Sequence, residues 1–168
     1  MNDAHFHLIV NHMPIIVPII GLLVMIGGFI SKSEAVKRAA YFIFILAAVC
    51  ALPAMASGEG AEEIVEHMPG ADHHLIHEHE EMAETLAMLC YILGGLSLVG
   101  LWASFKKKSF GNIVSLIVLV FSVVVIYFGY QTGTSGGEIT HEEIRADFKV
   151  EEHEHHDHDG HDHEGHDH

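Results

Sequence analysis

The sequence predicts an all-α membrane protein in which four transmembrane helices form an up-down-up-down bundle. Hydrophobic residues make up 49% of the 168 residues, yet the formal net charge is −15. Such values coexist when apolar and charged residues are segregated along the chain. The apolar residues do fall in four runs, each close to the roughly 20 residues that cross a bilayer. The predicted spans are about 13–30, 39–57, 83–105 and 111–130.

The first span begins at Met13, and Pro14 suits the first turn of a helix because its missing N–H is not needed there. This run lacks the basic start of a signal peptide, so Met1 is expected close to the mature N-terminus. The second and third spans hold Cys50 and Cys90, which predicts free thiols in apolar surroundings. Only Glu84, at the edge of the third span, is charged. Short basic loops join the spans in pairs, which favours antiparallel hairpins.

The segment 58–82 is predicted to be a helical loop. Residues 60–68 favour a helix, Pro69 and Gly70 break it, and Asp72 can cap a helix that runs into the third span. Residues 1–150 together form the transmembrane domain. Residues 151–168 consist of histidine, aspartate, glutamate and glycine, cannot bury a core, and are predicted to be disordered.

Basic residues set the orientation. Of the eight lysines and arginines, only Arg145 and Lys149 lie outside the loops 31–38 and 106–110. The positive-inside rule therefore places both loops in the cytoplasm, and both termini and the loop 58–82 on the exoplasmic side. We expect a multi-pass protein of the bacterial inner membrane with periplasmic termini. Its expected partners are the lipid bilayer and other membrane subunits or further copies of this chain. The acidic outer face argues against nucleic-acid binding.

All seventeen histidines lie on this predicted outer side. Imidazole is the commonest metal ligand of proteins and a frequent haem ligand. His7 and His12 flank the start of the first span, but a spacing of five on one helix puts them about 140° apart. A shared site therefore needs His7 on a non-helical lead-in, or each histidine serves a different neighbour. An interfacial His12 that simply reaches water is the alternative.

Three further groups of candidate ligands follow. Glu59, Glu63 and His67 can share one stripe of a helix, where a carboxylate and an imidazole suit a divalent ion or one orients the other. A solvated acidic helix face is the plain alternative. His79 lies one turn before the third span. His141 and Glu138 follow Gly136-Gly137, a pair that favours a tight turn bringing them over the bundle mouth.

These motifs carry a resemblance. His7-x4-His12-x-Pro14, the Gly-Glu-x-Ala-Glu-Glu-x-Val-Glu-His stretch ending at His67, His79-Glu-Glu and Gly137-Glu-Ile-x-His141 resemble a family of small four-span bacterial inner-membrane proteins catalogued as a domain of unknown function. The resemblance spans about residues 4–144 and excludes the tail. It implies the four-helix fold and one shared polar cluster, but no reaction. Met13 stands where that family often has an aromatic residue.

The leading hypothesis is a transition-metal site on the periplasmic face. Mixed imidazole and carboxylate ligands suit Zn, Cu, Fe or Ni, among which the pattern does not distinguish. No Asp, Glu, Lys, Arg or His lies at mid-membrane, which weakens ion transport as the role relative to storage, sensing or delivery. The predicted ligands are His12, Glu63, His67, His79 and His141, with His7, Glu59 and Glu138 as secondary candidates.

The tail is predicted to collect metal, with a plain solvated tail as the alternative. Its repeated imidazoles and carboxylates on a flexible chain can chelate an ion in many geometries, and affinity falls where imidazole protonates. The interspersed acidic residues and glycines argue for a natural tail rather than a purification tag. The tail histidines are His153, His155, His156, His158, His161, His163, His166 and His168.

Two other functions stay open at this point. The chain could be a b-type haem protein or an accessory subunit of a respiratory membrane complex, with His12 and His79 as axial haem ligands. It could also be a structural or assembly subunit that binds no cofactor. No nucleophile or second catalytic group is identifiable, so an enzyme is not expected.

Overall fold

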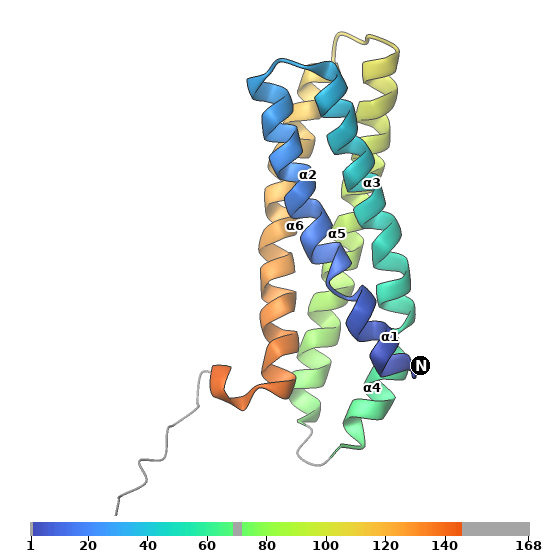
Figure 1. The fold of residues 1–168 in the computed structure, drawn as a ribbon, viewed down its shortest axis with the longest axis vertical. Coiled ribbons are helices and arrows are strands. Elements are labelled where there is room, and N and C mark those ends of the chain that lie inside the picture. Colours follow the sequence, from blue (N-terminus) through green and yellow to red (C-terminus); the bar gives the residue numbers. More distant parts are fainter. Residues whose placement is uncertain (1, 69–71, 146–168) are drawn as a thin grey trace, which may run out of the picture.

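A computed structural model describes residues 2–68 and 72–145, and every secondary-structure element within these ranges is a helix (Figure 1). Four long helices are accompanied by two short ones and a 3₁₀ turn. The elements are α1 (Asp3–Val10), α2 (Met13–Ile30), α3 (Glu34–Ala56), α4 (Gly58–Glu66), α5 (His73–Phe105), α6 (Gly111–Thr140) and η1 (Glu142–Ile144).

The long helices α2, α3, α5 and α6 form an up-down-up-down bundle (Figure 1). Each packs on its neighbour in the chain, and α6 closes the ring against α2. The tight turns 31–33 and 106–110 lie together at one end, which we call the Lys-rich end. At the other end, the His-rich end, α1 packs on α4 beside the start of α5 and the end of α6.

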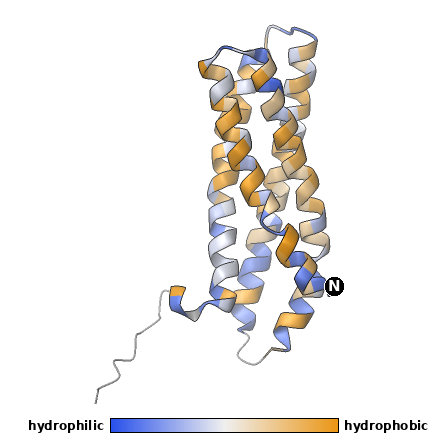
Figure 2. Cartoon of the chain, viewed as in Figure 1, coloured by the Kyte–Doolittle hydropathy of each residue, from blue (hydrophilic) through white to orange (hydrophobic). Residues whose placement is uncertain are grey.

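All four long helices are long and apolar enough to cross a membrane, which indicates a multi-pass membrane protein. Large apolar side chains face outward along them; Leu23 is 64% exposed and Val120 is 59% exposed. Such faces suit contact with lipid tails. Figure 2 shows hydrophobic residues along most of α2 and α3, and hydrophilic residues gathered where α5 begins. The sequence-based prediction of four spans is confirmed at this level, whereas orientation stays a prediction.

Pro14 separates α1 from α2. A proline ring clashes with the carbonyl four residues earlier, and α1 accordingly ends at Val10. Helix α2 then begins at Met13 with Pro14 in its first turn, as predicted, and His12 is its N-cap residue. His7 and His12 therefore do not share one continuous helix, and the separation of about 140° expected for one helix does not apply to them.

Pro18 removes one backbone hydrogen bond inside α2. Because proline has no N–H, the carbonyl of Pro14 lacks its usual partner one turn later. The thiol of Cys90, which is fully buried, lies 3.7 Å from that carbonyl oxygen and donates to it. Both cysteines are free, as predicted, although Cys50 is only half-buried.

Helix α5 is longer than the predicted third span and begins at His73 rather than at residue 83. The side chain of Asp72 accepts a hydrogen bond from the backbone N–H of His74 at 2.9 Å, which confirms its predicted role as N-cap. The apolar part of α5 begins near Thr85. His79 therefore stands on a rigid helical extension beyond the membrane-spanning part.

A buried hydrogen bond joins α3 to α6. The hydroxyl oxygens of Tyr41 and Ser115 are 2.8 Å apart, and Ser115 also donates to the carbonyl of Gly111 at 2.9 Å. Because Ser115 uses its only proton there, Tyr41 is the donor to Ser115. Tyr41 is 1% exposed, so no water can replace this acceptor.

We expect Ser115→Ala to destabilise the bundle more than Tyr41→Phe. The serine change strands a buried phenol hydroxyl, which costs about 1–3 kcal/mol. The tyrosine change leaves Ser115 bonded to Gly111 and costs about 0.5–1.5 kcal/mol. Denaturant unfolding of the two variants in detergent measures the difference, and the reverse order would contradict the assigned donor.

Candidate functional site

A cavity of about 500 Å³ opens at the His-rich end of the bundle. Buried apolar residues such as Ala51, Leu86 and Ala87 line it toward the bundle interior. All six α-helices contribute to its wall, and its volume is typical of small-molecule pockets. The titratable side chains on the wall are His7, His12, Glu59, Glu62, His79, Glu80, Glu84 and His141.

His79 is held against α6 by a serine. Its Nδ1 atom lies 3.0 Å from Ser135 Oγ, and the Ser135 hydroxyl donates to the carbonyl of Thr132 at 3.0 Å. Since that hydroxyl has no second proton, Ser135 Oγ must accept a hydrogen bond from the Nδ1–H of His79. The Nε2 atom of His79 then carries the lone pair, which is the atom available to a ligand.

His7 is held in the same way by α3. Its Nδ1 atom lies 3.0 Å from Ser57 Oγ, and the Ser57 hydroxyl donates to the carbonyl of Ala54 at 3.0 Å. The same reasoning assigns the proton of His7 to Nδ1 and leaves Nε2 with its lone pair. Two imidazoles from different helices thus line one cavity, and both carry their proton on Nδ1.

Both imidazoles favour the neutral state. Burial lowers the pKa of His79, and the nearby imidazole of His7 lowers it further. Burial also lowers the pKa of His7; a hydrogen bond involving the backbone of Ala54 opposes this shift, and the neighbouring His12 adds to it. Both residues precede the apolar part of their span. At neutral pH both are therefore uncharged, as a metal ligand or haem ligand must be.

The cavity also holds carboxylates and an amide oxygen that has no hydrogen-bond partner. Burial, and then the nearby charges of Glu80 and Glu66, raise the pKa of Glu62. The side-chain oxygen of Asn11, between α1 and α2, is buried and has no hydrogen-bond partner. The wall therefore offers carboxylates of two helices and one free acceptor beside the imidazoles.

The structure brings together some of the predicted ligands. His12, His79 and His141 line the cavity, together with the secondary candidates His7 and Glu59. His141 is exposed, and its Nδ1 atom lies 2.9 Å from an oxygen of Glu143.

Three other predicted ligands lie outside the cavity wall. Helix α4 buries Ala61, and Glu63 lies roughly 200° around the helix from it, facing away from the bundle. His67 is exposed, with Nδ1 2.6 Å from the carbonyl oxygen of Glu63. The carbonyl of Glu138 accepts from Arg145 at 2.8 Å.

The prediction of a tight turn at Gly136-Gly137 is wrong. Helix α6 continues through both glycines to Thr140. Gly136 instead permits a close approach, because a Cβ atom there would lie 2.8 Å from Cε1 of His79. The glycine thus makes room for the imidazole ring against α6.

Within residues 2–68 and 72–145, no three His, Cys, Asp or Glu side chains gather closely enough to hold an ion. The five-residue cluster of the sequence analysis therefore stays a prediction. The tail histidines and the break at Pro69 and Gly70 lie outside the described residues. Comparisons with family models, curated proteins and solved structures find no match. The family resemblance likewise stays a prediction.

Sequence reasoning missed the residues that position the imidazoles. Ser57 and Ser135 lie 50 and 56 residues from the histidines they hold, so no local spacing could reveal them. Glu62 had a usable signal, because it flanks the buried stripe that Ala61 and Val65 mark at i,i+4 spacing. Asn11 lies in the break between α1 and α2, three residues before Pro14, at the end of the bundle where the cavity opens.

Proposed function

We propose that the chain binds a transition metal ion in the cavity at the His-rich end. One observation carries this proposal: His7 and His79 enter the cavity from different helices, each with Nδ1 held by a serine and Nε2 left free. Metal-bound histidines characteristically donate their other ring N–H to a fixed acceptor, which sets ring orientation and raises basicity. Burial keeps both rings neutral, which removes the proton competition that weakens exposed imidazoles.

Further ligands come from the cavity rim. His12 is exposed at the junction of α1 and α2, where side-chain rotation can turn its ring inward. Glu62 and Glu80 supply carboxylates from α4 and α5. Two or three imidazoles with a carboxylate suit Zn, Cu, Fe or Ni, and the buried Asn11 oxygen can accept a hydrogen bond from water on the ion.

The predicted orientation places this site on the periplasmic side of the bacterial inner membrane. In this proposal, the histidine tail captures ions and raises their local concentration near the cavity, as a tethered binding segment does. The middle of the four spans holds no Asp, Glu, Lys, Arg or His, which favours storage, sensing or delivery over passage across the bilayer.

A second candidate function is haem b binding. The cavity is larger than an ion requires, and its inner wall is apolar, which suits a porphyrin edge. His79 has the arrangement of an axial ligand, with Nδ1 fixed by Ser135 and Nε2 free. The sequence-based pairing of His12 with His79, in a subunit of a respiratory complex, belongs to this candidate. A Soret band in the purified protein would identify it.

Metal analysis with a tail-neutral protein tests the proposal. In the full-length chain, the eight histidines of residues 151–168 are replaced by asparagine, so that bound metal reports on the cavity and not on the tail. We call this variant the tail-neutral protein. We expect this protein to bind about one transition-metal ion in a titration. The His79→Ala variant should bind more than about 100-fold more weakly, because removal of a ligand costs more than the 10–100-fold that loss of an outer partner costs.

His67→Ala is the matched control. His67 lies on the same face of the membrane but outside the cavity, and its replacement should leave affinity unchanged. Equal losses from His67→Ala and His79→Ala would overturn the cavity assignment and favour the wider cluster with Glu63. A tail-neutral protein that binds neither metal nor haem would overturn both candidates and leave a structural subunit.

A further inference from the structure

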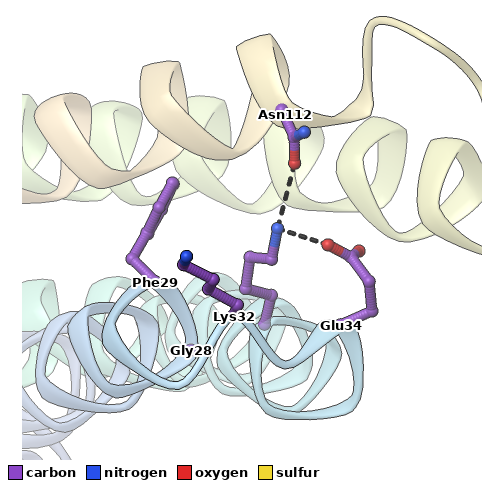
Figure 3. Close-up of a pocket in the computed structure, with 6 residues that line it drawn as sticks. Gly28, Phe29, Lys32, Glu34 and Asn112 are labelled. Atoms are coloured by element: carbon purple, nitrogen blue, oxygen red, sulfur yellow. Dashed lines mark hydrogen bonds and ion pairs between the residues drawn. The ribbon is translucent and has the colours of Figure 1, made fainter.

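A second pocket, of about 400 Å³, lies at the Lys-rich end, far along the bundle from the histidines. Residues of α2, α3 and α6 and of the turn between α2 and α3 surround it (Figure 3). Two lysines and one glutamate line the pocket, so its wall carries one net positive charge. The lining residues are Gly28, Phe29, Lys32, Glu34, Lys37 and Asn112.

Lys37 is the buried cation of this pocket, with a side chain only 7% exposed. Its ammonium group pairs with Glu34 and donates to Asn112 Oδ1 at 3.1 Å. The α2 backbone fixes its position, because a Cβ atom at Gly28 would lie 2.7 Å from Lys37 Cγ. An ammonium group has three donors, and these two bonds leave one. The ammonium also lies 5.3 Å from the centroid of the Phe29 ring, so a ligand in the pocket would share this third donor with the ring face.

Glu34 balances the charge of Lys37 but not that of Lys32. Its carboxylate also accepts a hydrogen bond from Ser104 on α5 at 3.1 Å and lies near Arg38. The positive charge of Lys32 is additional to this balanced group. The amide nitrogen of Asn112 has two further donors, because its oxygen is the atom that accepts from Lys37.

Lys32 is placed by an unusual backbone conformation. Its φ angle is 51°, in the left-handed region, at the turn that follows α2. Figure 3 shows its side chain beside Phe29, on the wall of the pocket. The pocket wall thus carries N–H donors on Lys32, Lys37 and Asn112, a residue set that suits an anion with several oxygens.

The pocket lies at the depth of lipid headgroups. Helix α2 ends at Ile30, which is 79% exposed, and Lys32 follows directly. Lysines at the end of an apolar span hold their charge at the interface while the stem covers apolar surface. A lipid phosphate is the anion present at that depth in high local concentration. A choline headgroup would bring a second cation toward two lysines, so a lipid with net negative charge fits better.

We propose that this pocket binds the phosphodiester of an anionic phospholipid, with Lys32, Lys37 and Asn112 as its donors. The bound lipid occupies the junction of α2, α3 and α6 and stabilises the Lys-rich end of the bundle. This site is independent of the histidine cavity and of any metal bound there.

Thermal unfolding of the full chain in detergent, with and without added lipid, tests this proposal. We expect phosphatidylglycerol to raise the unfolding temperature, and phosphatidylcholine at the same concentration to raise it much less. Native mass spectrometry should retain phosphatidylglycerol preferentially. Lys32→Gln should weaken retention about fivefold, as expected for one interfacial cation. Lys32 is exposed, so this variant should still fold.

Lys107→Gln is the matched control, because Lys107 is also an exposed turn lysine with φ 49° but belongs to the other loop. It should retain the lipid as the parent protein does. Equal losses from the two variants would show nonspecific attraction to the basic end and overturn the site. Equal stabilisation by both lipids, or full stabilisation by inorganic phosphate alone, would overturn the assignment to an anionic lipid.

Discussion

Replacing Gly100 by valine should destabilise the bundle by about 3 kcal/mol, the largest effect expected of a single change in its core. A Cβ atom at this position of α5 would lie 2.4 Å from Cζ of Tyr41 and 2.7 Å from its hydroxyl oxygen. The tyrosine ring is buried and bonded to Ser115, so it can move aside only by losing that bond. Denaturant unfolding in detergent measures the cost.

Gly95→Val on the same helix is the control. A Cβ atom there meets nothing within 4 Å, and Gly95 lies on the outer face of α5. This variant should change stability by less than about 1 kcal/mol. Combining Gly100→Val with Tyr41→Leu should recover part of the loss, because the smaller side chain removes the clashing atoms. Valine is a better helix former than glycine, so helix propensity does not predict a loss at either position. Equal destabilisation at both glycines would therefore contradict the assignment of the cost to the α3–α5 contact.

Much of the fold could be predicted because the bilayer imposes strict local requirements. An apolar run of sufficient length must satisfy its own backbone hydrogen bonds, so each of the four runs becomes a helix. Pro14 and Asp72 gave the starts of α2 and α5 for equally local reasons, since a proline ring and a capping carboxylate act within one turn. The lengths of α3 and α5 beyond the apolar runs carried weaker signals, because polar residues there are neither required nor forbidden in a helix.

The candidate site could be predicted only in part. Histidines at helix mouths are visible in the sequence, and the bundle does bring His12, His79 and His141 to one cavity. The orientation of each side chain depends on how the short helices pack. Glu63 was expected to share the site, but the buried stripe of α4 turns it outward. The pairing of an imidazole with a distant serine depends on the packing of two helices and leaves no spacing pattern.

The two serine–histidine pairs fix the tautomer of both imidazoles in the cavity, which a high number of histidines alone would not do. An exposed imidazole exchanges tautomers and is partly protonated near neutral pH. His7 and His79 are held in one tautomer by Ser57 and Ser135, whose own protons are bonded to backbone carbonyls. The Nε2 atoms are therefore preorganised for metal binding before an ion arrives, which lowers the entropic cost of ordering the ligands on binding.

Gly136→Ala tests the preorganisation of His79 by Ser135 without removing any ligand. A Cβ atom at this position of α6 would lie 2.8 Å from Cε1 and 3.2 Å from Nδ1 of His79, so the ring must leave Ser135. A flexible side chain can rotate away, and the folding cost should stay below about 1 kcal/mol. Metal affinity, however, should fall by about 10–100-fold, the usual effect of losing the partner that orients a ligand. Metal titration of the tail-neutral protein measures it.

Gly133→Ala, one turn earlier on the same helix and also on the cavity wall, separates the loss of the Ser135 hydrogen bond from any general disturbance of α6 or of the wall. A Cβ atom there would lie 3.7 Å from Cδ1 of Ile15, an ordinary contact, and metal affinity should not change. Ser135→Ala should reproduce the loss seen with Gly136→Ala, because it removes the same hydrogen bond without crowding the ring. Unchanged affinity in both Gly136→Ala and Ser135→Ala would mean that His79 binds metal from another orientation, or not at all, and that its serine partner serves only the packing of α5 on α6.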